Sequence, residues 1–332
     1  MEILYPKYYK KFSCIAAACP DSCCQEWDVD VDPESAQYYR SLQGPLGDRL
    51  RQVLQDTEDG TVMVIEDRRC PMWRQDGLCQ IQAELGHQAL CQVCREFPRL
   101  RHDYGDFMEL GLELSCPEAA RLILSDEDRD WIAETTAESG EAEYDSETMA
   151  ILLRSRREFS AFLDTTSLSV PEILTVLLLY AHDVQEELDG GATAVLQPTQ
   201  NLADGILFAK QSHSVPLQEF FLGLEILTPR WEQRLQQPSA TPDWNGQYKL
   251  LLRYFISRYW LQAVSDYDLL CRVKLMIAAC ILIGHLGGNL QETSQLFSKE
   301  IENNPDNVEA ILDGAYTASA LTDLNLLGLL LN

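Results

Sequence analysis

The chain has 332 residues, of which 46% are hydrophobic, a composition that fits one or two globular domains with a substantial core. Its formal net charge of −26 repels phosphate groups, so neither nucleic acid nor an anionic membrane is expected as a partner. The same charge favours a basic substrate such as a lysine-bearing protein surface, unless the acidity only keeps the protein soluble. The apolar run 277–286 is too short to cross a membrane and the first residues show no secretion signal, so we expect a cytoplasmic protein without membrane insertion.

Cysteines are crowded into the first part of the chain. Nine of the eleven lie in the first 116 residues, and four of these fall between Cys14 and Cys24. Thiolates are soft ligands, so such a cluster suits zinc or an iron–sulfur centre. A disulfide framework is the alternative, but it is typical of small secreted domains, and an odd number of cysteines cannot pair completely. In a reducing cytoplasm we therefore expect metal ligands.

Short elements are predicted over the first 65 residues. Residues 1–12 are rich in Tyr and Lys and form either a lid over the cysteine cluster or a plain entry segment. Alternation over 27–31 indicates a strand, and Asp32 before Pro33 is a good N-cap for a helix that runs to about 43. Two more elements follow, a helix over 45–54 and a β-prone run over 61–65.

A second group of cysteines lies between residues 70 and 94. Cys70 and Cys79 bracket an Asp-Gly turn, which folds the chain back and can bring both thiols to one side. A short helix is predicted over 80–90, and a C-x-x-C motif follows at 91–94.

Two arginines, Arg95 and Arg99, follow the C-x-x-C motif, and Pro98 between them ends the helical stretch. Their guanidinium groups are candidates for holding an anionic ligand or for hydrogen bonding to a metal–thiolate centre. Surface salt bridges are the equal alternative.

The clearest predicted strand runs over 108–114, where apolar and other residues alternate strictly. Its predicted buried face consists of Met108, Leu110, Leu112 and Leu114. Cys116 follows the end of this strand, and a rigid element is a favourable place for a metal ligand.

Residues 126–147 contain ten acidic residues and one basic residue, so we expect a solvated acidic helix and linker at a domain boundary. The pattern from Ser146 onward is helical, with Cys271 and Cys280 in the core of the longest apolar helix. The predicted fold is mainly α. A Cys-rich α+β metal-binding region, 1–125, packs on an all-α domain, 148–332, with 126–147 between them.

The order of the cysteine motifs resembles the flagellin lysine-N-methylase (FliB) family, which belongs to the broader CxxCxxCC zinc- or iron-chelating proteins. The resemblance covers about the first 125 residues closely. The motifs that carry it are Ser13-Cys14-Ile15, Cys19, Cys23-Cys24, Trp27, Cys70-Pro71, Gly77-Leu78-Cys79-Gln80-Ile81, Cys94-Arg95, Phe97-Pro98-Arg99 and Ser115-Cys116-Pro117-Glu118-Ala119-Ala120-Arg121.

The resemblance implies methyl transfer from S-adenosylmethionine to lysine side chains of flagellin or another lysine-rich protein. It also implies a cysteine-bound metal centre, with a [4Fe–4S] cluster as the expected form and zinc as the alternative. The cysteines that match the family are Cys14, Cys19, Cys23, Cys24, Cys70, Cys79, Cys94 and Cys116. Cys91 is an addition to this set.

These eight cysteines exceed the four ligands of one cluster, so either two centres exist or some thiols are structural or redox-active. Glu26 stands where a radical-SAM motif needs its third cysteine, so that assignment fails, and no glycine-rich SAM loop is found. The alternatives to a methyltransferase are a metal-binding redox or iron-sensing protein and an adaptor with a structural metal. We expect the active cleft where the helical part meets the Cys-rich part, with carboxylates of the helical part forming a mouth that attracts the basic substrate.

Overall fold

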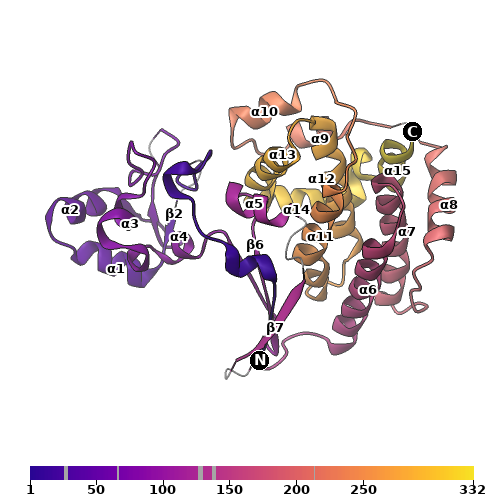
Figure 1. The fold of residues 1–332 in the computed structure, drawn as a ribbon, viewed down its shortest axis with the longest axis horizontal. Helices are drawn as coiled ribbons and strands as arrows, with labels where there is room; N and C mark the ends of the chain where they lie inside the picture. Colours follow the sequence, from indigo (N-terminus) through magenta and orange to yellow (C-terminus); the bar gives the residue numbers. More distant parts are fainter. Residues whose placement is uncertain (26–28, 66, 126–129, 137–139, 213) are drawn as a thin grey trace.

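A computed structural model describes residues 1–25, 29–65, 67–125, 130–136, 140–212 and 214–332. Figure 1 shows a small part with α1 to α4 on one side and a larger helical part on the other. The strands are β1 Glu2–Pro6, β2 Val29–Val31, β3 Leu54–Asp56, β4 Thr61–Met63, β5 Arg99–Asp103, β6 Phe107–Leu112 and β7 Trp131–Thr135. The helices before residue 125 are α1 Pro33–Ser41, α2 Gly44–Val53, α3 Gln80–Leu85, α4 Gln92–Glu96 and α5 Pro117–Ile123.

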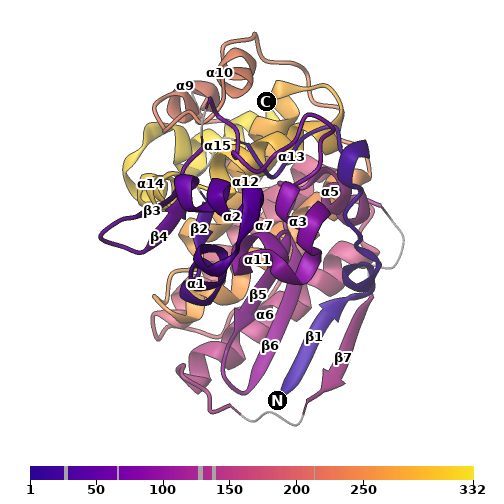
Figure 2. The same cartoon turned by 90° about the vertical axis from the view of Figure 1, so that its left-hand side faces the viewer.

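The larger sheet has the strand order β5-β6-β1-β7, and Figure 2 shows its strands side by side. Strand β1 pairs in parallel with β6 and antiparallel with β7, with Tyr5 opposite Ile132. The N-terminal residues thus form an inner strand of the sheet rather than a lid. The short 3₁₀ turn η1, Lys7–Lys11, then leads toward the cysteine-rich loop.

The predicted acidic helix is wrong for Trp131–Thr135, which form strand β7. The physical reason is a partner far away in the sequence: β1 offers a free edge, and its neighbouring lysines neutralise the acidic segment. Lys7 pairs with Asp130 at 2.6 Å, and Lys10 pairs with Glu134 at 2.5 Å. Residues 126–129 and 137–139 of the predicted linker lie outside the described residues.

The small part has its own sheet, β2-β4-β3, and its own core, in which Tyr39 and Leu50 are fully buried. The Asp32 side chain accepts the Ser35 amide hydrogen at 2.9 Å, which confirms the predicted N-cap of α1. Trp27, at the start of the predicted strand 27–31, and Glu26 lie outside the described residues; Val29–Val31 are the strand β2.

The larger part is helical, as predicted, and Ser169 and Glu172 form a capping box at the start of α7. Cys271 and Cys280 are buried in α12, as expected. The remaining helices are α6 Ser146–Thr165, α7 Val170–Leu188, α8 Pro198–Ala209, α9 Leu217–Leu222, α10 Pro229–Leu235, α11 Gln247–Tyr259, α12 Leu270–Leu286, α13 Leu290–Phe297, α14 Pro305–Thr317 and α15 Asp323–Leu331. Among the described helices, none combines the length and the apolar character that crossing a bilayer requires.

Residues before position 125 contribute to both hydrophobic cores. The end of β6 and the whole of α5 belong to the larger core, where Leu112, Leu114 and Ala119 pack with the helices. Helix α5 packs against α13. Cys116, at the start of α5, is therefore held by the helical part, whereas Cys24, Cys70, Cys79 and Cys91 lie in or against the smaller core.

Candidate metal centre

A cavity of about 400 Å³ opens between the cysteine-bearing segments, and we call it the thiol pocket. Seven of the eight cysteines that the family resemblance singles out line its wall. They are Cys14, Cys19, Cys23, Cys24, Cys79, Cys94 and Cys116. The eighth, Cys70, lies beside them, because its amide donates to the Cys24 carbonyl oxygen at 2.8 Å. The structure thus gathers thiols from segments that are up to a hundred residues apart.

Two tight turns bring the cysteines of the small part together. The 3₁₀ turn Ala16–Ala18 follows Cys14, whose sulfur accepts the Ala16 amide hydrogen at 3.4 Å. The predicted Asp-Gly turn is present, with Gly77 at φ +80°, where a side chain would be strained. Gly77 also approaches the other loop, since a Cβ atom there would lie 3.5 Å from the Ala17 Cα.

The thiols contact one another in small groups. Hydrogen bonds with Cys23 and Cys70 raise the pKa of Cys24, and the same bonds lower the pKa of Cys23 and of Cys70. Cys91 and Cys94 form a second pair, in which the hydrogen bond raises the pKa of Cys94 and lowers that of Cys91. Cys91 is therefore a direct neighbour of a predicted ligand.

A third group lies where the loop meets α5. Burial raises the pKa of the Cys19 thiol, and it raises that of Cys116 to about 12. Cys14 adds to both shifts through its charge, so the three sulfurs are near one another. Burial likewise raises the pKa of Cys79.

The donor chemistry of the thiol pocket fits a thiolate-bound metal centre. Soft sulfur donors face a cavity whose other walls include Phe12, Trp73 and Phe97, and apolar surroundings are typical of iron–sulfur sites. Within the described ranges, no three Cys, His, Asp or Glu side chains surround one point closely enough to hold an ion as they stand.

Of the two arginines predicted to bind a cofactor, Arg99 lines the thiol pocket. Its guanidinium lies over the Phe12 ring, 5.3 Å from the centroid. Arg95 is not among the lining residues, and its side chain donates to the Leu90 carbonyl oxygen at 3.4 Å. The structure thus brings one arginine of the pair to the thiols.

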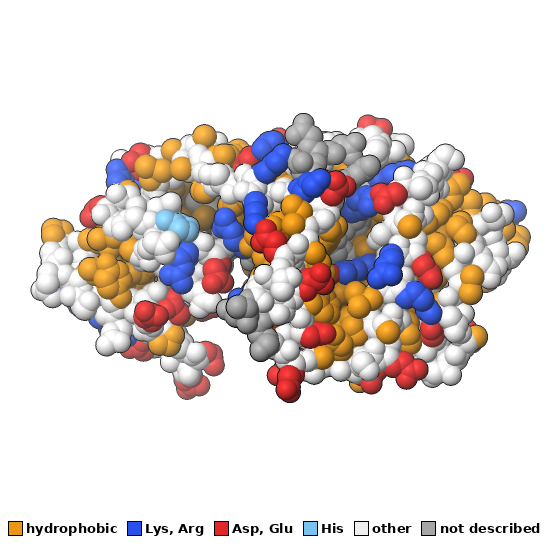
Figure 3. All heavy atoms as spheres, turned by 60° about the horizontal axis from the view of Figure 1, so that its bottom comes forward, with side chains coloured by type: hydrophobic (Ala, Val, Ile, Leu, Met, Phe, Trp, Pro, Cys, Tyr) orange, Lys and Arg blue, Asp and Glu red, His pale blue; other side chains and the backbone are white. Residues whose placement is uncertain are grey.

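The described residues that line the thiol pocket all lie between Phe12 and Pro117. The expectation that carboxylates of the helical part form its mouth is therefore wrong for this cavity. Figure 3 shows Lys and Arg side chains mixed with carboxylates near the middle of one face rather than a uniformly acidic surface. A different hollow, between α7 and the start of α12, collects carboxylates of the helical part; its acidic lining residues are Asp183, Glu186, Asp189, Asp266 and Asp268.

Sequence reasoning did not select three polar residues at or beside the thiol pocket. His87 lines it, as does Asp21, which lies between Cys19 and Cys23. Lys299 of the helical part forms an ion pair with Asp21 at 3.1 Å. The position of Asp21 between two cysteines was the available signal for it, whereas Lys299 lies in a helical segment without any recognisable motif.

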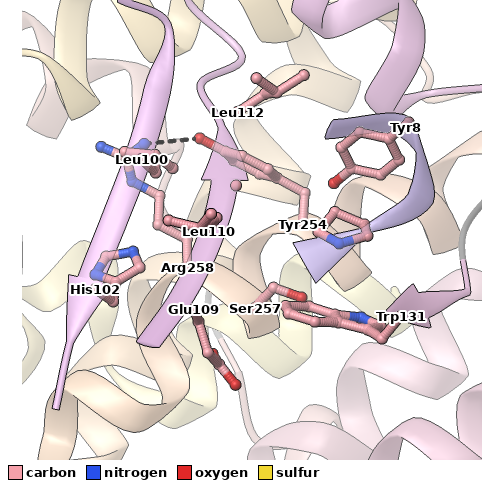
Figure 4. A pocket seen from close by; sticks show the side chains of 12 residues that line it. Tyr8, Leu100, His102, Glu109, Leu110, Leu112, Trp131, Tyr254, Ser257 and Arg258 are labelled. Atoms are coloured by element: carbon pink, nitrogen blue, oxygen red, sulfur yellow. Dashed lines mark hydrogen bonds between the residues drawn. The ribbon is translucent and has the colours of Figure 1, made fainter. Parts of the chain in front are cut away.

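A second, smaller cavity lies between the larger sheet and α11 (Figure 4). Its volume of about 20 Å³ has room for about one water molecule, so it cannot hold a substrate. Arg258 lies at its wall and donates to the Tyr254 hydroxyl at 3.0 Å, and its charge is paired with Glu302 at 3.2 Å. This cavity is part of the structural core.

No family model matches the chain, and no solved structure is similar to it. The chain is similar to proteins named lysine-N-methylase from Salmonella typhimurium and Salmonella choleraesuis, with 30% identity over 141 residues in both cases. Each match covers 40% of this chain and 34% of the relative, so the chain spans about one third of the length of these relatives.

A protein of Salmonella muenchen named flagellar biosynthetic protein FliU is 29% identical over 137 residues. That match covers 37% of this chain and 77% of FliU. A relationship to the broader CxxCxxCC proteins stays a prediction. The resemblance to lysine-N-methylases that the ordered cysteine motifs predicted is confirmed by these similarities.

Proposed function

We propose that the protein is a protein-lysine N-methyltransferase that uses S-adenosylmethionine and acts on flagellin or another lysine-rich protein in the cytoplasm. One observation carries the proposal: seven cysteines converge on one cavity in a chain that is homologous to lysine-N-methylases. The proposed metal centre is a [4Fe–4S] cluster, with zinc as the alternative, held by thiolates of the thiol pocket.

The reaction places clear demands on the pocket. The methyl group leaves the sulfonium sulfur and forms a bond to the lysine nitrogen, and that nitrogen must first lose a proton. Free lysine has a pKa of about 10.4, so the site must favour the neutral amine, and apolar walls do so by desolvation. Phe12, Trp73 and Phe97 supply such walls.

The same walls suit S-adenosylmethionine, which carries a carboxylate and an aromatic base. Arg99 is the candidate for the carboxylate, because its guanidinium is a strong hydrogen-bond donor and is already fixed over Phe12. The cavity of about 400 Å³ falls in the size range of small-molecule sites. A bound iron–sulfur centre would supply electron transfer at a potential set by its thiolates and their surroundings.

A structural metal is the second candidate function, and the size of the smaller core favours it. That core contains thirteen buried residues, two of them cysteines. Small domains with so little buried surface commonly rely on metal for stability. In this case the metal holds the fold and takes no part in a reaction.

Anaerobic purification followed by metal analysis and calorimetric titration with S-adenosylmethionine separates these functions. The methyltransferase proposal predicts bound metal, a broad visible absorption band if the metal is an iron–sulfur cluster, and saturable binding of S-adenosylmethionine. A colourless zinc protein that gives no heat with S-adenosylmethionine would favour the structural role. Metal-bound protein that binds no S-adenosylmethionine but changes oxidation state reversibly would favour a redox function.

A further inference from the structure

A buried lysine of the helical part reaches into the cysteine-rich loop. Lys299 is 4% exposed, and its ammonium group lies 3.1 and 3.2 Å from the two carboxylate oxygens of Asp21. Asp21 lies between Cys19 and Cys23 and lines the thiol pocket. This ion pair joins positions 278 residues apart in the sequence.

A neighbouring glutamine makes a second connection from the same helix. The Gln295 side-chain amide donates to Asp21 at 2.9 Å and to the Ser115 carbonyl oxygen at 2.8 Å. Ser115 precedes Cys116. Gln295 therefore fixes the loop that carries Cys19 and Cys23 relative to the start of α5, where Cys116 lies.

The local backbone explains why the Lys299 side chain points toward the cysteine-rich loop. Residues Ser298–Glu302 form a π-helical turn, η5, after α13, and such turns are frequent at functional sites. Each charged side chain of this turn has a different partner. Glu300 accepts the Leu227 amide hydrogen at 2.9 Å, and Glu302 accepts hydrogen bonds from the Tyr254 and Tyr259 hydroxyls at 2.8 Å each. The turn is thus held in place on the helical side while Lys299 faces the loop.

We propose that Lys299 and Gln295 are positioning residues of the thiol pocket. They hold the Cys19–Cys23 loop against Cys116, so that thiols from the two parts of the protein share one cavity. The role of this positioning depends on the proposed metal centre. The contacts that hold the loop are present in the protein without metal. A buried ion pair that loses one partner leaves an uncompensated charge, so removal of Lys299 should release the loop.

The test compares Lys299→Met with Lys274→Met in the full chain. Lys274 is a matched control, because it is also a buried lysine of the helical part, paired with Asp323 at 2.9 Å and remote in sequence from the cysteine loop. Hydrogen exchange of the metal-free protein, followed by mass spectrometry, should show at least about tenfold faster exchange for residues 14–25 in Lys299→Met alone. Equal exchange of that segment in Lys299→Met and wild type would overturn the proposal.

Cobalt(II) titration provides a second readout, because thiolate-to-cobalt charge-transfer absorption reports sulfur ligands directly. Outer contacts of metal sites typically change affinity by 10–100-fold, so we expect about tenfold weaker cobalt binding in Lys299→Met and wild-type binding in Lys274→Met. Asp21→Asn combined with Lys299→Met should weaken binding little more than either change alone, since both remove one interaction. Fully multiplicative losses would contradict the pairing. Absence of the charge-transfer band in the wild type would reject the metal centre, and hydrogen exchange would still decide the positioning role.

Discussion

Cys24 connects two of the thiol-bearing segments, because it contacts Cys23 in its own loop and Cys70 in the next segment. The two neighbours are the thiols whose pKa this contact lowers, which favours their thiolate forms. A metal centre requires thiolates, and Cys23, Cys24 and Cys70 are candidate ligands that lie next to one another.

Replacing Cys23 by Ser should therefore lower metal content and the solubility of the protein together. We expect metal affinity to fall by about tenfold or more, because a hydroxyl is a poor soft-metal ligand. Metal analysis after anaerobic purification measures the effect. Cys271→Ser is the matched control, since Cys271 is buried in α12 with its sulfur 3.6 Å from the Asp268 carbonyl oxygen. Unchanged metal content and stability in Cys23→Ser would contradict the assigned role of the loop.

The two arginines give a second comparison at this scale. Arg99→Met should weaken S-adenosylmethionine binding by about tenfold, the effect of losing one charge-assisted hydrogen bond. Arg95→Met should leave the affinity within about twofold of the wild type, because the Arg95 side chain is directed to the Leu90 carbonyl group instead. Calorimetric titration measures both. Equal losses of affinity in the two variants would show that Arg99 does not bind S-adenosylmethionine.

Among the elements, those with strong local signals were predictable and those that depend on distant partners were not. The proline-led start of α1 and its Asp32 N-cap have their causes within a few residues, and both lie where predicted. Strand β7 forms because it pairs with β1, about 130 positions away. Local sequence does not show this partner, and the acidic composition of the segment suggested a helix instead. The buried face of β6 was also only partly predictable: Met108 and Leu112 are buried, but so is Glu109, which pairs with Arg156.

Helix α15 is joined to α7 and α12 through Asp323, and this contact should make stability depend on pH. Burial opposes the charged form of Asp323, but the His182 ring at 3.0 Å and the Lys274 ammonium group at 2.9 Å lower its pKa from 3.8 to about 2. Because the pKa is lower in the folded state, the carboxylate stabilises the fold above pH 3.8, and this contribution is lost as the pH falls to about 2.

Asp323→Asn should therefore lower the free energy of unfolding at neutral pH by about 1 kcal/mol, a value reduced for solvent screening of a partly exposed pair. Urea unfolding at a series of pH values measures the difference between variant and wild type. The difference should shrink as the pH falls below about 4. A gap that stays constant down to pH 3 would show that the carboxylate charge is not the cause.

At the scale of the whole molecule, the thiol pocket lies where two parts with unequal cores meet. The larger core supports Cys116 through α5, and the smaller core supports Cys24 and Cys79 of the pocket. The gathering of these cysteines could be predicted from their clustered spacing in the sequence. Their supports were not predictable, because Lys299 and Gln295 lie about 180 residues beyond Cys116 in a segment with no local sign of a site.

The measurement that tests the central claim most directly is mass spectrometry of flagellin lysines after incubation with S-adenosylmethionine and the anaerobically purified, metal-loaded protein. We expect methylated lysines with the wild type and with Cys271→Ser, and no methylation above background with Cys23→Ser. Methylation that is as efficient in Cys23→Ser as in the wild type would separate the reaction from the thiol pocket. Absence of methylation by metal-loaded wild-type protein that binds S-adenosylmethionine would contradict the proposed activity toward flagellin.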